Sequence, residues 1–318
     1  MRMSALISRH RLRATAALLL GALIAAGSGC TATEAQPSAQ TTAAATTPSP
    51  GPALWSFGDD DTTVYLFGTV HLLKPDTQWL TPHFEAAWQA SDVLYMEANT
   101  DSAEVQAGLA RKMQEIGVYR DGSSLLDRLS DEERATVAAA ADALGVPLPA
   151  IAPLKPWLAG LQLSVMQLVK SGYDPASGVE TVLSGDPVIA DKQRRYFETA
   201  DQQIEFFEQL TQADQVAMLV AGSRAVVEEP EALDELVRAW SRGDVAELAS
   251  LMSSVDAFGS EAVYQLLLTD RNRDWVPRIE ALLSEPGTHM IAVGAGHLAG
   301  TDSVIAMLER RGHSVTRR

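Results

Sequence analysis

Short apolar runs alternate with longer amphipathic segments through most of this chain. The short runs are rich in β-branched and aromatic residues and end in glycine or polar residues, which is typical of buried strands. The predicted strands are residues 63–67, 92–98, 194–198, 289–293 and 313–316. Between the first two strands, Thr81 precedes Pro82 and an apolar stripe, and this arrangement predicts a helix.

The residues between 100 and 283 are predicted to be mainly helical. Ser130 and Glu133 have the spacing of a capping box, and Gly145 is expected to end the helix that they begin. Pro156 opens a strongly apolar helix. Further helices are predicted at residues 199–223, 230–242, 245–252, 271–283 and 302–311.

This order of elements indicates the fold class. A strand, a helix and a second strand within residues 63–98 predict a crossover unit, with the two strands as parallel neighbours. We therefore expect an α/β (α+β) fold with a central, mostly parallel sheet and a large inserted helical portion. Open α/β sheets bind ligands at the carboxyl ends of their strands, so the site is expected there.

Two Gly-x-x-His motifs follow predicted strands at opposite ends of the chain. The first runs from Gly68 to His71 and the second from Gly294 to His297. Glu97 ends a strand that is otherwise apolar, and a buried acid needs a cation or a histidine beside it. Two imidazoles and one carboxylate also form a set that binds a divalent metal and leaves a coordination position for water.

The glycines of these motifs have two interpretations. Gly68, Gly294 and Gly296 permit positive φ and a close backbone approach to a substrate or an ion. The alternative is that they only mark the ends of strands. The sequence GAGHLAG differs in spacing from a dinucleotide fingerprint, and only 22 residues follow Gly296, so no nucleotide partner is expected.

Charge and the N-terminus narrow the function classes. The formal net charge is −16, and without the four arginines of the first 29 residues the balance is 21 basic against 41 acidic residues, or −20, which argues against nucleic acid as a partner. Residues 1–29 are predicted to be a signal peptide, because a basic start precedes an apolar core too short to span a bilayer. Residues 30–54 are predicted to be a disordered tether and residues 55–318 the folded domain.

Cys30 is the only cysteine of the chain and directly follows the apolar core. We expect it to be lipidated, which predicts an exported lipoprotein of the cell envelope, held to a membrane at the outer membrane or the periplasmic face. The alternative is an ordinary signal peptide with an incidental cysteine.

The paired histidine motifs belong to an ordered set of short motifs that spans residues 55–315. After GTVH and YMEAN, and before GAGH, the set contains KPW at 155–157, GVE at 178–180, FETADQQ at 197–203, WSRGD at 240–244 and DRNRDW at 270–275. In these motifs the chain resembles the TraB/PrgY/GumN family, which includes the Tiki metalloproteases.

The resemblance implies a site built from His71, Glu97 and His297. It implies a divalent-metal cofactor, with manganese or cobalt expected and zinc or iron as alternatives, and hydrolysis of a peptide or a small envelope substrate. Arg271 matches an arginine of the family. It is expected either to bind a substrate carboxylate or oxyanion as a catalytic residue, or to pair with an acid.

Gln203 and Lys155 also lie in family motifs and could be site residues, but helix-surface roles are expected for both. Three functions stay open from the sequence. The first is metal-dependent hydrolysis, with Glu97 as third ligand or as general base. The second is metal-free hydrolysis, in which His71 activates water and Glu97 orients it. The third is capture of a peptide or envelope component without turnover.

Overall fold

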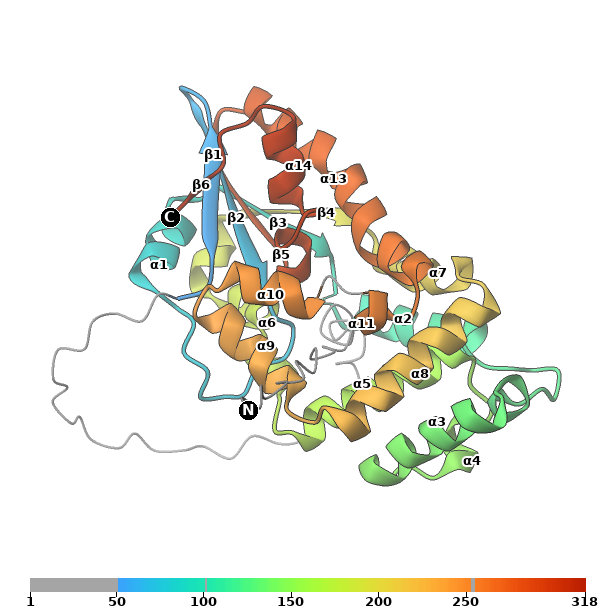
Figure 1. Ribbon diagram of the computed structural model, residues 1–318. Coiled ribbons are helices and arrows are strands. Elements are labelled where there is room, and N and C mark those ends of the chain that lie inside the picture. The colour runs from blue at the N-terminus through green and yellow to red at the C-terminus, as the bar shows by residue number, and fades with distance from the viewer. Residues whose placement is uncertain (1–50, 101, 253–254) are drawn as a thin grey trace, which may run out of the picture.

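The computed structural model describes residues 51–318 apart from 101 and 253–254 (Figure 1). The predicted signal peptide, Cys30 and most of the predicted tether lie outside these residues. The strands are β1 (Leu54–Gly58), β2 (Thr62–Thr69), β3 (Val93–Ala98), β4 (Gln193–Glu198), β5 (Gly287–Gly294) and β6 (Thr316–Arg317).

Helices cover most of the remaining described chain. The α-helices are α1 (Pro82–Ala90), α2 (Ala103–Ile116), α3 (Asp131–Leu144), α4 (Leu148–Ile151), α5 (Pro156–Lys170), α6 (Val179–Gly185), α7 (Ala200–Gln209), α8 (Gln212–Glu228), α9 (Ala232–Ser241), α10 (Val245–Met252), α11 (Val255–Phe258), α12 (Glu261–Tyr264), α13 (Asp270–Ala281) and α14 (Val304–Arg310). The shorter elements are η3 (Leu125–Arg128), η4 (Pro175–Ser177), η5 (Pro187–Asp191), η7 (Leu282–Ser284) and η8 (Ala295–Leu298), with a π-helical stretch, η6 (Gln265–Thr269).

The six strands form one mixed sheet in the order β4-β3-β5-β2-β1-β6. Strands β2, β3, β4 and β5 are parallel, whereas β1 is antiparallel to both β2 and β6. The expected fold, an α/β (α+β) architecture with a mostly parallel sheet and a large helical portion, is confirmed.

One expected pairing is wrong. β2 and β3 are parallel but are not neighbours, because β5 lies between them and pairs with both. The almost wholly apolar β5 suits this central position, which is buried on both faces. The crossover from β2 to β3 therefore skips one strand, and that place is filled from the far end of the chain.

Alternate residues of the strands separate the core into two clusters. Val64 and Leu66 of β2 pack on one face against α13 and α14, together with Ile291 and Val293 of β5. The opposite face packs against α1 and the helices of the inserted portion. The alternation of strand side chains thus buries both faces of the sheet under helices.

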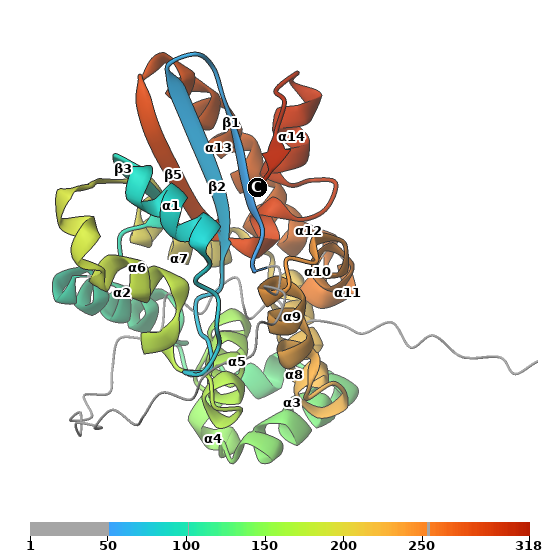
Figure 2. The same cartoon turned by 90° about the vertical axis from the view of Figure 1, so that its left-hand side faces the viewer.

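Figures 1 and 2 show the sheet in the upper half of the molecule and the inserted helices α3, α4, α5 and α8 in the lower half. The carboxyl ends of β2 and β5 point toward these helices. Trp240 of α9 joins the two halves, because its indole N–H donates to the Gly68 carbonyl oxygen at 2.7 Å. Over the described part of the chain, no helix has the length and apolar character needed to span a membrane.

Several boundaries differ from the sequence prediction. The long helix predicted at residues 199–223 is two helices, because the chain leaves α7 at Leu210 and Thr211 caps the start of α8. Strand β1 was not predicted, and the last strand lies at Thr316–Arg317 instead of residues 313–316. The capping box of Ser130 with Glu133 is present as predicted.

Candidate active site

The Glu97 side chain reaches the site from the carboxyl end of β3. Val93 and Tyr95, four and two residues earlier, pack in the core cluster that includes Trp275 of α13. Because strand side chains alternate, Glu97 lies on this same face and reaches α13 where the strand ends. It is 8% exposed, and its Oε1 accepts a hydrogen bond from the Gly294 backbone N–H at 2.8 Å.

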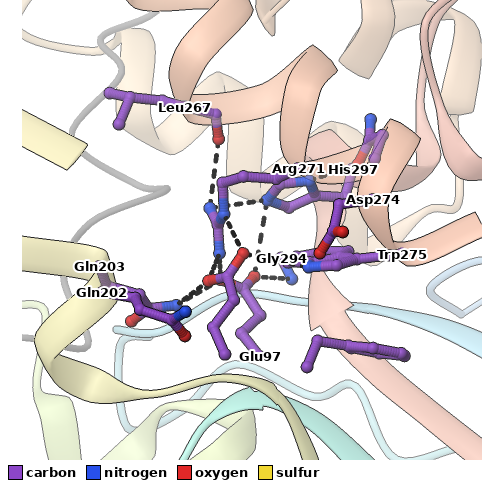
Figure 3. A network of polar contacts seen from close by, with 12 residues as sticks. Glu97, Gln202, Gln203, Leu267, Arg271, Asp274, Trp275, Gly294 and His297 are labelled. Carbon is purple, nitrogen blue, oxygen red and sulfur yellow. Dashed lines mark hydrogen bonds and ion pairs between the residues drawn. The ribbon is translucent and has the colours of Figure 1, made fainter. Parts of the chain in front are cut away.

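Arg271 of α13 is the cation that compensates this carboxylate. Its guanidinium contacts Glu97 Oε2 and makes two 2.8 Å hydrogen bonds to the carboxylate of Glu198 (Figure 3). It also donates to the carbonyl oxygen of Leu267, in the π-helical stretch before α13, at 3.2 Å. All three charged side chains are at least nine-tenths buried. Of the two expectations for Arg271, pairing with an acid describes this arrangement, and the pair lies inside the site.

Gln203 completes the contacts of the two carboxylates. Its side-chain N–H₂ group donates to Glu97 Oε2 at 3.2 Å and to Glu198 Oε2 at 3.0 Å. Figure 3 shows the side chains of Gln203 and Arg271 both directed at Glu97. The indole N–H of Trp275 donates to Glu198 Oε1 at 3.0 Å. Every oxygen of the two carboxylates therefore accepts at least one hydrogen bond.

His297 lies beside this network in a defined tautomer. The Asn272 amide N–H₂ donates to the Asp302 carbonyl oxygen at 2.8 Å, so the amide oxygen faces His297 Nδ1 at 2.6 Å. Arg271 Nη1 lies 3.1 Å from Nε2 and can only donate. Nδ1 therefore carries the proton and Nε2 accepts, which makes His297 neutral with both ring nitrogens occupied.

Electrostatics agree with this assignment. Complete burial and the nearby Arg271 guanidinium lower the pKa of His297 to about 3. Burial alone would raise the pKa of Glu97, but the charges of the Arg271 guanidinium and the His71 ring, with the hydrogen bond from Gly294 N–H, outweigh it and lower the value to about 2. The resting site thus contains a neutral His297 and an ionised Glu97.

His71 follows β2 and has the opposite electrostatics. Its Nδ1 lies 2.8 Å from Glu180 Oε1, an ion-pair distance, although the ring N–H is not aligned on that oxygen as a hydrogen bond requires. Burial opposes the charged ring, but the Glu180 carboxylate outweighs burial and raises the pKa of His71 to about 9. His71 is therefore an imidazolium at neutral pH. Glu97 also raises this pKa, which places the two groups within electrostatic reach of each other.

The chain matches one known protein family over nearly all of its described residues. A model of the TraB/PrgY/gumN family matches residues 53–317. The chain belongs to this family. No curated protein and no solved structure matches it. The match covers both Gly-x-x-His motifs, Glu97 and Arg271, so the family assignment includes every residue of the site.

In the part of the chain that the structure describes, the candidate site lacks the ligand arrangement of a divalent metal. Among the described residues, no three His, Cys, Asp or Glu side chains stand close enough together to hold an ion. The guanidinium of Arg271 contacts Glu97 and lies at the one free electron pair of His297. As arranged, these side chains do not fit a metal, because the Arg271 guanidinium already contacts Glu97 and His297, two of the three predicted ligands.

The motif glycines act through close packing. None of Gly68, Gly294 and Gly296 has a positive φ, contrary to the expectation that they supply this conformation. A Cβ on Gly68 would lie 3.0 Å from the Cα of Ala295, so glycine lets the two motifs pack together. Gly294 contributes its N–H to Glu97.

Sequence reasoning missed two carboxylates and misplaced an amide. Glu198 is the last residue of β4 and Glu97 the second-last residue of β3, so an acid at the carboxyl end of a second strand was a signal that could have found it. Glu180 stands in the GVE motif but had no predicted role. Gln203 was expected on a helix surface and is a buried site residue, whereas Lys155 pairs with Glu208 at 2.6 Å on the outside of the protein.

Proposed function

We propose that this TraB/PrgY/gumN family member is a hydrolase of peptides, or of small envelope compounds with an amide or ester bond, and that its own side chains carry out the acid–base steps. The observation that carries the proposal is the pairing of opposite charges in one buried site. His71 Nδ1 lies 2.8 Å from Glu180 Oε1, which favours the protonated ring, and the Arg271 guanidinium contacts Glu97, which favours the ionised carboxylate. A pair of groups whose pKa values are pushed apart is the arrangement that assigns an acid and a base.

In the proposed reaction Glu97 accepts a proton from water, and the resulting hydroxide adds to the substrate carbonyl carbon. Arg271 donates hydrogen bonds to the oxyanion that forms. His71 then gives its proton to the leaving nitrogen or oxygen as the bond to the carbonyl carbon breaks. Proton exchange with solvent returns both groups to their resting states. His297 takes no proton and holds the guanidinium in place.

The contact with Arg271 controls the basicity of Glu97. A pKa of about 2 makes the carboxylate a weak base at rest. A carbonyl oxygen that takes over a hydrogen bond from the guanidinium weakens its hold on Glu97 and raises this pKa. Substrate binding is therefore proposed to activate the base, so water is not activated while the site is empty.

Metal-dependent hydrolysis is a second candidate, with His71, Glu97 and His297 as ligands of manganese or cobalt. Two contacts support it. His71 Nδ1 faces Glu180, and His297 Nδ1 faces Asn272. In metal-binding histidines the nitrogen that does not bind the metal contacts a carboxylate or another polar group in this way. In that case Arg271 has to leave His297 before the metal binds.

Peptide hydrolysis in the presence and absence of a chelator separates these candidates. We expect the mature protein to release products from a peptide mixture, detected by mass spectrometry, with the same rate after metal removal. Glu97→Gln and His71→Gln should lower the rate at least about 100-fold, whereas His83→Gln, on the exposed side of α1, should not. Activity that is lost on chelation and restored by manganese or cobalt would favour the metal. Saturable binding without product would leave only a capture function.

Export and lipid anchoring are part of the proposal. The basic start, the 13-residue apolar core and the position of Cys30 support a lipoprotein of the cell envelope, attached to a membrane through Cys30. Mass analysis of the mature N-terminus is the test. An unmodified Cys30, or cleavage elsewhere, would contradict the anchor without bearing on the hydrolase.

A further inference from the structure

The loop that carries His71 is bound along its length by a second segment of the chain. Asp174 N–H donates to the Leu73 carbonyl oxygen at 2.9 Å, and Val179 N–H donates to the Val70 carbonyl oxygen at 3.1 Å. These bonds lie on either side of His71. We call residues 173–180 the clamp segment.

The clamp segment touches the backbone of His71 itself. A Cβ on Gly178 would lie 1.9 Å from the His71 carbonyl oxygen, so no other residue fits there without moving the loop. Gly178 has a φ of −61°, which any residue can adopt. Glycine is therefore required for the close approach and not for its conformation.

Glu180 ends the clamp segment directly beside the imidazole. Its Oε1 faces His71 Nδ1 at 2.8 Å and also accepts a hydrogen bond from the Thr69 hydroxyl. Its Oε2 is buried and has no hydrogen-bond partner among the described residues. A buried carboxylate is costly without compensation. Here the compensating groups are His71 and a hydroxyl two residues before it.

The other end of the clamp segment is fixed to the helical portion. The Tyr173 hydroxyl donates to Asp234 Oδ1 of α9 at 2.7 Å, and Lys74 Nζ donates to Oδ2 at 2.9 Å. Asp234 thus binds both the clamp segment and the His71 loop. The position of the loop is set by the helical portion as well as by β2.

We propose that Glu180 is the positioning residue of His71. It acts through the imidazole and does not touch the substrate. With Nδ1 held at Glu180, Nε2 is the ring nitrogen left for the substrate, and the clamp segment keeps the ring at that angle. The inference rests on the proposed function for its catalytic consequence only, because the orientation of the ring can be measured without any activity.

The test uses the full chain with ¹³C-labelled histidine. The chain has six histidines, and His71→Gln identifies the His71 ring signal. Glu180→Met removes the carboxylate, and we expect the His71 signal to shift and broaden while the other signals stay. Glu180→Gln keeps an oxygen at the same place without the charge, so it should restore most of the wild-type signal when the two proteins are compared at a pH low enough to protonate the His71 ring in both. Glu132→Met, an exposed glutamate of α3, is the matched control and should change nothing.

Activity then gives a second readout. If the protein hydrolyses peptides, Glu180→Met should lower kcat about 100-fold, as a misplaced catalytic group does, and leave KM within about twofold. A His71 signal that is the same in Glu180→Met and wild type overturns the positioning role. If the wild-type protein shows no activity and Glu180→Met still shifts the His71 signal, the hydrolase proposal is overturned and the positioning role stays supported.

If Glu180→Met does not fold, Thr69→Val carries the test. It keeps the carboxylate and the volume of the side chain but removes the hydroxyl that holds Glu180. We expect a smaller shift of the His71 signal in the same direction. No shift in a folded Thr69→Val protein overturns the role of the Thr69–Glu180 pair in orienting the ring.

Discussion

Replacing Arg271 by lysine is expected to destabilise the protein although the charge is kept. The guanidinium makes five polar contacts, two with Glu198 and one each with Glu97, His297 and the Leu267 carbonyl oxygen. A lysine ammonium has three donors on a single atom, so at least two of these contacts are lost. At about 1.5–3 kcal/mol for each hydrogen bond to a charged group, the expected loss is at least about 3 kcal/mol.

Urea unfolding followed by circular dichroism measures this loss. With a slope of about 2–3 kcal/mol per molar urea, a loss of about 3 kcal/mol lowers the midpoint by about 1 M. Arg273→Lys on the same helix is the control, because its pair with Asp270 is exposed and should change stability by less than about 0.5 kcal/mol. An Arg271→Lys protein as stable as the wild type would refute the view that guanidinium geometry holds the site together.

The pH dependence of Arg271→Met checks the same reasoning from the opposite side. Without the cation, two buried carboxylates stay uncompensated, which costs about 3–5 kcal/mol at neutral pH. As the pH falls the carboxylates can take up protons. Because burial without the cation raises their pKa above the ordinary value of 4.5, the deficit relative to wild type should begin to shrink above pH 4.5 and continue to shrink below it. A deficit that is constant from pH 7 to pH 3 would show that it comes from packing and not from charge.

Three further predictions concern single groups of the site. Because the pKa of Glu97 is lowered to about 2, it contributes about 3 kcal/mol to the free energy of unfolding above pH 4.5, and this contribution should be lost as the pH falls toward 2. A wild-type urea midpoint that stays level over this range contradicts the prediction. Because the pKa of His71 is raised to about 9, it contributes about 3 kcal/mol to the free energy of unfolding below pH 6.5, and this contribution is lost as the pH rises through 9. The urea midpoint should therefore fall over this range in wild type and stay level in His71→Gln. Trp240→Phe leaves the Gly68 carbonyl oxygen without its indole donor and should cost about 1–3 kcal/mol, whereas a cost below about 0.5 kcal/mol would mean that another donor replaces it.

Local patterns were sufficient to predict most of the individual elements. Strands β2, β3 and β5 were predicted within two residues at each end, since apolar and β-branched runs form strands wherever both faces are covered. The one strand pairing that was predicted, β2 with β3, was wrong, because the pattern of a strand indicates how buried it is and not which strand pairs with it. The helix break at Leu210 was missed for a related reason, since the apolar pattern of α7 continues into α8.

The candidate site residues His71, Glu97, Arg271 and His297 were named from the sequence, but their contacts were not. The structure joins Glu97, Arg271 and His297 in one network. The metal-free alternative gave Glu97 the orienting role, whereas the carboxylate beside His71 is Glu180 from an inserted helix. The contact of His71 with Glu180 depends on how the helical portion packs against the sheet. The two residues are far apart in the sequence, so no local pattern predicts that they meet.

The central position of β5 has a consequence for how the protein is made. Residues 287–294 fill the place between β2 and β3, so the sheet has a gap until almost the whole chain has been synthesised. Pairing of residues 62–69 with residues 287–294 closes a very long loop, and such non-local contacts form slowly. Gly294 and His297 arrive with the same segment, so Glu97 and Arg271 have no complete site before it docks. Any activity of the site would therefore begin only after this late segment has docked and the fold is complete.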